Sequence, residues 1–243
     1  MGLTGKTAWI TGGGTGIGAA GARALAGAGA SVVVSGRRAE PLEALAAEIG
    51  GKCRALPLDV ADAGAIEKAA AEIGPVDILV ASAGTNVPKR SMDKVEIEGW
   101  DRVVQVNLNG VFYAAHAVLP GMRAKGGGVL MLVSSWAGKY AERLTGAAYN
   151  ASKHAVVALS ESINTEEGVN GIRSTVIMPG EVATDILKSR PVPPSEAQMA
   201  KMLQAEDLGA TIRFVAEMPA RVCLNEILIS PTWNRFYTGF EEL

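Results

Sequence analysis

The chain contains few of the residues that build disulfide frameworks and metal centres. Its 243 residues include two cysteines, Cys53 and Cys223, and two histidines, His116 and His154. Two cysteines are too few for a disulfide framework or a cysteine-ligated metal cluster. Two histidines leave little room for a site built from several imidazoles. We therefore expect no metal site.

The chain also lacks a charge excess and a long apolar run. Lys and Arg number 23 and Asp and Glu 25, and this net charge of −2 argues against a nucleic-acid partner. No apolar run approaches the roughly 18 residues that a membrane span needs, so we expect no membrane partner. The N-terminal residues enter the short apolar stretch Thr7–Thr11 almost at once, without the pattern of a signal peptide. The expected location is cytoplasmic.

Hydrophobic residues make up 48% of the chain, in short runs that alternate with longer stretches of helical periodicity. Val-, Ile- and Leu-rich runs that are apolar on both faces are typical of strands covered by helices on both sides. The predicted strands are Thr7–Thr11, Ser31–Ser35, Arg54–Leu58, Asp77–Ala81, Val129–Ser134, Ser174–Met178 and Glu226–Ser230. The predicted helices begin near Gly16 and then cover Pro41–Ile49, Ala63–Ile73, Trp100–Met122, Tyr149–Glu167 and Ala205–Ala216.

Repeated strand–helix units of this length require right-handed crossovers. The sequence therefore predicts a Rossmann-type α/β fold, with a doubly wound, seven-stranded parallel sheet and helices on both faces. Residues 1–243 are expected to form a single domain, because no linker interrupts the alternation. The one long gap, Glu181–Met202, contains Pro191, Pro193 and Pro194, and we expect it to be a mobile substrate loop.

A glycine-rich turn joins the first strand to the first helix. It reads Thr11-Gly12-Gly13-Gly14-Thr15-Gly16-Ile17-Gly18. Glycines let the backbone approach a pyrophosphate without Cβ clashes, and the free N–H groups of the helix N-terminus then face the phosphates. The position between a strand and a helix favours dinucleotide binding over a glycine-rich loop without a ligand.

The end of the second strand predicts the choice of cofactor. A carboxylate there would hold an adenosine ribose diol, but the segment reads Ser35-Gly36-Arg37-Arg38. A guanidinium can instead pair with a 2′-phosphate, so NADP(H) is favoured, and NAD(H) stays the alternative. The competing interpretation is that both arginines are solvated turn residues.

Tyr149 and Lys153 are four residues apart in a helical segment, so their side chains share a face. A nearby ammonium favours tyrosinate, and we therefore expect Lys153 to lower the phenol's pKa. Ser135 follows the fifth strand, at the carboxyl edge where open α/β sheets bind ligands. Tyr140 is the rival tyrosine, but Leu144 occupies the position of its partner cation.

Taken in order along the chain, these motifs resemble the short-chain dehydrogenase/reductase family, in its compact single-domain branch. The match also includes Asp59-Val60, Asn107, and Pro179-Gly180 followed by Thr184. The resemblance implies that Tyr149 transfers the proton, that Ser135 positions the reacting oxygen, and that Lys153 also bonds the nicotinamide ribose. It also implies that Asn107 holds a water linking Lys153 to solvent, which completes a catalytic set of Asn107, Ser135, Tyr149 and Lys153. The implied cofactor-binding residues are Gly12, Gly14, Thr15, Gly16, Ile17, Gly18, Arg37, Asp59, Val60, Ser82, Ala83, Gly84, Tyr149, Lys153, Pro179, Gly180, Val182 and Thr184.

Two positions depart from the family's pattern. The family commonly has Asn-Asn-Ala-Gly after the fourth strand, where this chain has Ala81-Ser82-Ala83-Gly84, which puts a sheet-bracing hydrogen bond in doubt. NADP-dependent members often carry a basic residue at the position of Thr15, so the expected phosphate preference depends mainly on Arg37.

The predicted function is reversible hydride transfer between NADP(H) and a carbonyl or secondary alcohol of a small molecule. The alternatives are an NAD-dependent alcohol or hydroxy-acid dehydrogenase of the same family and a non-catalytic dinucleotide-sensing protein. Arg143, Lys188 or Arg190 either pairs with a substrate carboxylate or is a solvated surface charge. The resemblance implies a homodimer or homotetramer in which Trp100–Met122 and Tyr149–Glu167 pair across a two-fold axis.

Overall fold

The computed structural model describes residues 2–190 and 192–238 and contains one seven-stranded parallel sheet with the strand order β3-β2-β1-β4-β5-β6-β7. This architecture confirms the predicted doubly wound fold. The strands are β1 (Thr7–Thr11), β2 (Ser31–Ser35), β3 (Cys53–Ala55), β4 (Ile78–Ala81), β5 (Gly128–Val133), β6 (Ile172–Pro179) and β7 (Glu226–Ile229).

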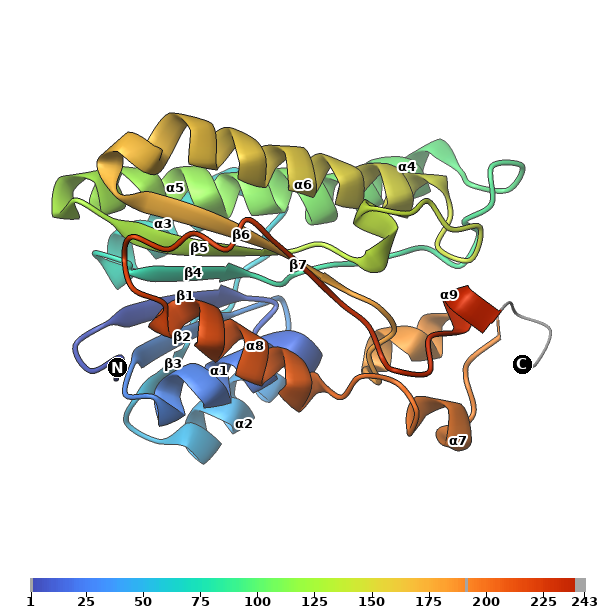
Figure 1. The fold of residues 1–243 in the computed structure, drawn as a ribbon, viewed down its shortest axis with the longest axis horizontal. Coiled ribbons are helices and arrows are strands. Elements are labelled where there is room, and N and C mark those ends of the chain that lie inside the picture. The colour runs from blue at the N-terminus through green and yellow to red at the C-terminus, as the bar shows by residue number, and fades with distance from the viewer. Residues whose placement is uncertain (1, 191, 239–243) are drawn as a thin grey trace.

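Helices cover both faces of the sheet (Figure 1). One layer contains α1 (Gly16–Gly27), α2 (Ala39–Ile49) and α8 (Ala205–Glu217). The opposite layer contains α3 (Ala63–Ile73), α4 (Ile97–Val104), α5 (Gly110–Lys125) and α6 (Ala147–Glu167). No helix in the described part of the chain has the length and apolar character required to cross a bilayer.

The strand β1 shows why apolar residues occupy both faces of each inner strand. Ala8 and Ile10 pack into the core beneath α1 and α8, whereas Trp9 packs into the core beneath α3, α5 and α6. All three side chains are fully buried. Successive strand residues point to opposite faces, so a strand between two helical layers needs apolar residues at every position.

Two predicted elements differ from the structure. The third strand is Cys53–Ala55 rather than Arg54–Leu58, although the Leu56 and Leu58 amides still donate to the carbonyls of Val34 and Gly36 (2.9 Å each). The single helix predicted over Trp100–Met122 is divided into α4 and α5 by a π-helical turn, Gln105–Asn109. A π-helical turn is defined by hydrogen bonds from residue i to residue i+5, and the spacing of apolar residues in the sequence does not report which backbone groups are bonded.

The segment expected to be a mobile loop contains a 3₁₀ turn, Asp185–Ser189, and the short helix α7 (Glu196–Met199). Ser195 and Gln198 form a reciprocal capping box at the start of α7. Pro191 and the side chain of Lys188 lie outside the described residues. The mobility of the segment Glu181–Met202 stays a prediction.

A half-buried carboxylate, Asp77, joins three segments at the opposite end of the sheet from the glycine turn. Asp77 accepts hydrogen bonds from the Thr7 amide (2.9 Å) and the Lys6 ammonium (3.3 Å), and it also pairs with Lys125. Burial alone would raise the pKa of Asp77, but Lys125, the Thr7 amide and Lys6 outweigh it and lower the pKa below its ordinary value. The ionised carboxylate therefore stabilises the folded chain.

We expect Asp77→Asn to lower the free energy of unfolding at pH 7 by about 1 kcal/mol, the scale of a charge-assisted hydrogen bond. Because the folded pKa is depressed, this contribution exists above the unfolded pKa of about 3.9 and disappears as pH falls through the folded value. Denaturant titrations at pH 7 and near pH 3.5 should show the gap between wild type and variant shrinking. Glu67→Gln, on an exposed position of α3, is the control, and a gap that does not change with pH would contradict the assignment.

Candidate functional site

The glycine turn after β1 passes within contact distance of the chain segment after β4. Gly12 has φ +66°, and a Cβ there would lie 2.6 Å from the Ala83 amide nitrogen. A Cβ on Gly18 would collide with the Gly12 carbonyl oxygen. Only glycine fits these two positions, because the turn backs against α1 on one side and the end of β4 on the other. Gly18 therefore shapes the turn. It lines neither of the two cavities described next.

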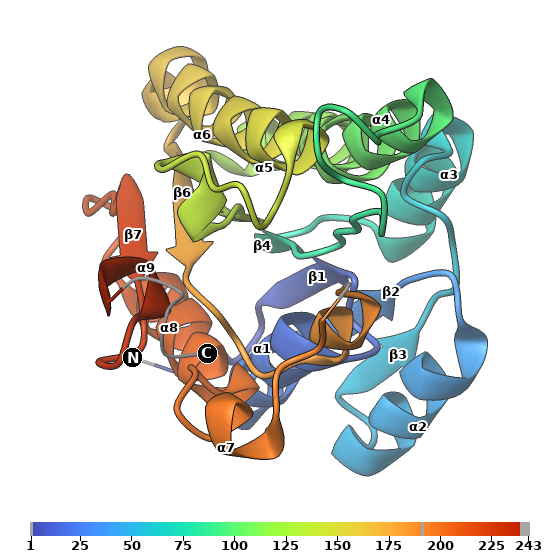
Figure 2. The same ribbon diagram turned by 90° about the vertical axis from the view of Figure 1, so that its right-hand side faces the viewer.

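Two cavities follow the carboxyl edge of the sheet, the edge that faces the viewer in Figure 2. The larger has a volume of about 280 Å³ and the smaller about 180 Å³. Gly12, Thr15, Ala83 and Gly84 line both, so the cavities form one elongated crevice across the glycine turn. This is the place where doubly wound sheets bind dinucleotides, because the strand order reverses between β1 and β4.

The smaller cavity brings together the residues that are predicted to contact the adenosine part of the cofactor. Arg37, Asp59 and Val60 line it with Gly14. Asp59 also stabilises its own turn, because its Oδ1 accepts a hydrogen bond from the Ala61 amide at 3.0 Å. The structural and the cofactor-binding interpretations of Asp59 are therefore compatible.

The larger cavity contains the remaining predicted residues. Ser135, Tyr149 and Lys153 line it, which places the three groups of the predicted proton-transfer set at one end of the crevice. The other predicted residues along this cavity are Gly16, Ile17, Ser82, Pro179, Gly180, Val182 and Thr184.

Lys153 is held inside the protein by two reciprocal hydrogen bonds. Its ammonium donates to the Val133 carbonyl at 2.9 Å, and its own carbonyl accepts from the Ser134 hydroxyl at 2.7 Å. The side chain is 3% exposed, and burial lowers the pKa of Lys153 to about 8. Its Nζ lies 5.6 Å from the centroid of the Tyr149 ring. These bonds attach α6 to the end of β5 and thereby orient the phenol toward the crevice.

The expected lowering of the phenol's pKa by Lys153 is wrong for the structure. Burial raises the pKa of Tyr149 above its ordinary value, and contacts with Ser135, Arg190 and Arg90 only partly offset that rise. The desolvated phenol is therefore protonated near neutral pH. The spacing of Tyr149 and Lys153 indicated the shared face, but not the burial.

Asn107 lies in the π-helical turn rather than along the crevice wall. Its Oδ1 accepts from the Thr85 amide at 2.8 Å, and its Nδ2 donates to the Thr85 carbonyl at 3.0 Å and to the Ser152 hydroxyl at 3.2 Å. Asn107 thus clamps the segment after β4 to α6. The backbone amide of Ser82 donates to the Thr11 carbonyl at 3.1 Å and joins the end of β4 to β1.

The segment Pro179–Thr184, which is predicted to bind the nicotinamide, lies against the glycine turn. The Gly180 amide donates to the Ile229 carbonyl at 2.7 Å, and Val182 forms a parallel bridge with Leu203. A Cβ on Gly16 would lie 3.0 Å from Thr184 Cγ2, which shows how closely the two segments approach.

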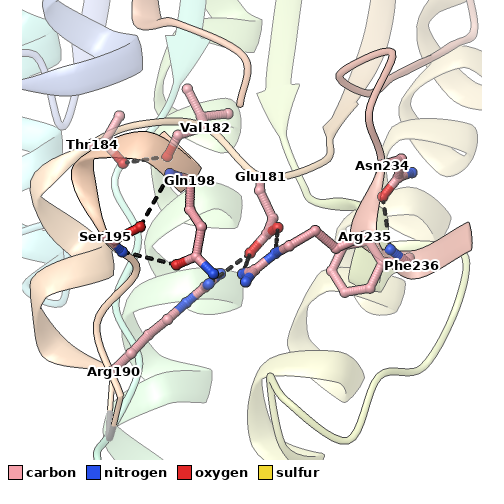
Figure 3. Close-up of polar contacts among 9 residues, drawn as sticks. All are labelled: Glu181, Val182, Thr184, Arg190, Ser195, Gln198, Asn234, Arg235 and Phe236. Carbon is pink, nitrogen blue, oxygen red and sulfur yellow. Dashed lines mark hydrogen bonds and ion pairs between the residues drawn. The ribbon is translucent and has the colours of Figure 1, made fainter. Parts of the chain in front are cut away.

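A buried carboxylate, Glu181, anchors this segment (Figure 3). It pairs with Arg235 through Nε at 2.5 Å and through Nη2, and with Arg190 at 2.6 Å. Arg235 belongs to the short helix α9 (Arg235–Thr238), so the carboxylate joins two distant stretches of chain. Burial raises the pKa of Glu181, but the two guanidiniums outweigh burial and lower it below the usual value. Arg190, considered as a partner for a substrate carboxylate, is therefore already paired within the protein.

Several residues of the larger cavity belong to no sequence motif. Arg90 lies in the long connection between β4 and α4, and Phe236 follows Arg235 near the end of the described chain. Phe236 stacks on Trp136 with ring centroids 5.8 Å apart. Neither belongs to a motif, and only the folded chain brings them to the crevice.

Comparison with known proteins agrees with this geometry. A family model described as short chain dehydrogenase matches residues 6–193. The chain is 37% identical over 241 residues to the glycine betaine reductase of Emericella nidulans, covering 94% of this chain and 19% of that much longer protein. It is 33% identical to an uncharacterized oxidoreductase of Staphylococcus haemolyticus, covering 94% and 98%. A solved serine dehydrogenase complexed with NADP⁺ matches 98% of both chains with a TM-score of 0.86 and 29% identity.

We expect Glu181→Gln to reduce the free energy of unfolding by about 3 kcal/mol, because it leaves the nearly buried Arg235 guanidinium without a counter-charge. Glu217→Gln is the matched control, since it breaks the exposed Arg213–Glu217 pair on α8 and should cost less than about 0.5 kcal/mol. Chemical denaturation of the three proteins at pH 7 measures both effects. Equal losses in the two variants would contradict the anchoring role of Glu181.

Proposed function

We propose a hydride-transfer reaction for this chain, which belongs to the short-chain dehydrogenase family. The reaction runs between NADP(H) and a carbonyl or secondary alcohol of a small molecule, with Tyr149 as the acid/base group. The observation that carries the proposal is the joint position of Ser135, Tyr149 and Lys153 at one end of the crevice lined at its other end by Arg37.

The crevice fits a dinucleotide in shape and chemistry. Any side chain on Gly12 would collide with Ala83, so this position must be glycine. The turn therefore presents bare backbone, which a pyrophosphate can approach closely. The amides at the start of α1 add the donor groups that phosphates require. When bound, the cofactor supplies or accepts the hydride.

The side chains divide the proton chemistry between them. In carbonyl reduction, Tyr149 gives its proton to the substrate oxygen while the Ser135 hydroxyl donates a hydrogen bond to the same atom. The raised pKa of Tyr149 keeps this proton in place at neutral pH and suits the reducing direction. In alcohol oxidation, Tyr149 must first lose the proton, so we expect that direction to accelerate as pH rises. Lys153 lies beside the phenol as a buried cation up to pH values near its pKa of about 8.

The preference for NADP(H) depends on Arg37. Arg37 lines the smaller cavity with Asp59 and Val60, and a guanidinium beyond the end of β2 supports pairing with a ribose 2′-phosphate. No acidic residue follows β2 before α2 to hold a free ribose diol, since the connection reads Gly36-Arg37-Arg38. The serine dehydrogenase of similar structure is described as complexed with NADP⁺, which supports the same cofactor here.

The names of two similar proteins suggest a substrate range. One is a glycine betaine reductase and the other a serine dehydrogenase, and both names refer to small polar molecules with a charged nitrogen. A homodimer or homotetramer and a cytoplasmic location stay predictions for this chain.

We expect Tyr149→Phe to reduce kcat for carbonyl reduction about 10²- to 10⁴-fold, the usual contribution of a positioned acid. The affinity for NADPH should change little, because the ring that lines the crevice is retained. Steady-state kinetics and fluorescence titration of NADPH separate the two effects. Tyr140→Phe, which removes the hydroxyl of the exposed rival tyrosine, is the control, and full activity of Tyr149→Phe would refute its role.

We expect Arg37→Ser to raise the KM for NADP⁺ about 10- to 100-fold and to leave the KM for NAD⁺ nearly unchanged, because only NADP⁺ carries the phosphate that the guanidinium pairs with. Arg54→Ser on β3 is the matched control, since that guanidinium pairs with Glu72 outside the crevice. A wild-type enzyme that uses NAD⁺ more efficiently than NADP⁺ would favour the NAD-dependent alternative.

A further inference from the structure

Glu142 is one of three carboxylates, with Glu181 and Asp185, that line the same cavity as Ser135 and Tyr149. It belongs to the connection between the 3₁₀ turn Trp136–Gly138 and α6. The Glu142 carbonyl accepts hydrogen bonds from the Thr145 hydroxyl at 3.0 Å and from the Asn150 side-chain amide at 2.9 Å. The carboxylate is therefore carried by an anchored backbone at the cavity that Ser135 and Tyr149 also line.

The Glu142 carboxylate has no cationic partner among the residues that the structure describes. Arg90 and Arg190 line the same cavity, but their charges act on the pKa of Tyr149, and Arg190 is paired with Glu181. Burial raises the pKa of Glu142, and only the neighbouring Trp136 N–H acts in the opposite direction. A partly desolvated carboxylate without a counter-charge costs stability unless a ligand compensates it.

The indole of Trp136, beside this carboxylate, has an N–H group without a regular hydrogen bond in the described chain. Trp136 is 5% exposed, and its Nε1 makes no hydrogen bond of normal geometry within the described chain, although it approaches Glu142. Trp136 and Phe236 both line the cavity and stack on each other. Aromatic rings attract cations and tolerate the methyl groups of alkylated ones.

We propose that Glu142 binds a positively charged nitrogen of the substrate, either a protonated amine or a quaternary ammonium, close to the carbon that exchanges the hydride. This inference rests on the proposed function and specifies its substrate class as small amino alcohols and the corresponding amino carbonyl compounds. The substrate is small because the cavity of about 280 Å³ must also receive the nicotinamide end of the cofactor. Glu142 is then a specificity-determining residue, which forms a salt bridge with the substrate but takes no part in proton transfer.

A matched pair of secondary alcohols tests the proposal. 1-Aminopropan-2-ol and butan-2-ol have nearly the same shape, but only the first carries an ammonium at neutral pH. We expect wild-type kcat/KM for NADP⁺-dependent oxidation to favour the amino alcohol about 10- to 100-fold, the range of a charge-assisted contact in a partly dry site. Glu142→Gln should bring that ratio close to one, mainly through a higher KM for the amino alcohol. Glu67→Gln, on the exposed face of α3, should leave the ratio unchanged.

Calorimetric binding to the protein loaded with NADP⁺ separates this inference from the proposed function. If neither alcohol is oxidised but the amino alcohol binds more tightly and loses that advantage in Glu142→Gln, the hydride-transfer proposal fails and the ammonium site stands. If both alcohols are oxidised equally well, or if Glu142→Gln oxidises them with the wild-type ratio, the ammonium site is refuted while the hydride-transfer proposal survives. If neither alcohol is oxidised and the amino alcohol has no binding advantage, both proposals are refuted. Circular dichroism and thermal unfolding of Glu142→Gln verify that the variant is folded.

Discussion

The hydrogen bonds between the end of β5 and α6 determine how Tyr149 and Lys153 lie at the crevice. The Ser134 hydroxyl donates to the Lys153 carbonyl, and the Lys153 ammonium donates back to the Val133 carbonyl. They fix both the translation and the rotation of α6 on the sheet. Tyr149, one turn earlier on the helix, then faces Ser135, one residue beyond Ser134. If α6 shifted, buried polar groups of Ser134 and Lys153 would lose their partners, which would cost free energy. The arrangement therefore tolerates little displacement.

The second constraint is the buried Glu181 carboxylate with its two arginines. It connects the chain that leaves β6, the end of the Asp185–Ser189 turn, and α9 near the end of the described residues. Because Phe236 follows Arg235 directly, the same contact brings an aromatic ring against Trp136 at the cavity. The substrate side of the crevice therefore depends on an ion cluster of which Glu181 and Arg190 line the same cavity as Tyr149. Because the cluster is buried, removing any one of Glu181, Arg190 and Arg235 would leave a charge without full compensation.

Much of the crevice was predictable because its residues stand at fixed offsets from strands. The glycine turn follows β1, Arg37 follows β2, Asp59 and Val60 come shortly after β3, and Ser135 follows β5. Carboxyl ends of parallel strands meet at one edge, so the strand pattern alone brings these residues together. The π-helical turn at Asn107, the shorter β3 and the direction of the Tyr149 pKa shift were not predictable in this way. Each depends on contacts between segments that are far apart in the chain.

The amino-acid sequence by itself determined the doubly wound fold and the edge of the sheet at which the crevice lies, and it predicted that Ser135, Tyr149 and Lys153 come together there. Alternating apolar runs and short-range spacings carry this information because they act within one strand–helix unit. Only the tertiary structure decided which charges remain unpaired at the substrate end. Arg190 and Arg235 converge on Glu181, whereas Glu142 lies beside Trp136 and has no cationic partner within residues 2–190 and 192–238 as far as the structure describes them. The physical reason is that desolvation and ion pairing depend on which distant side chains share one buried volume, and no local pattern in the chain records that.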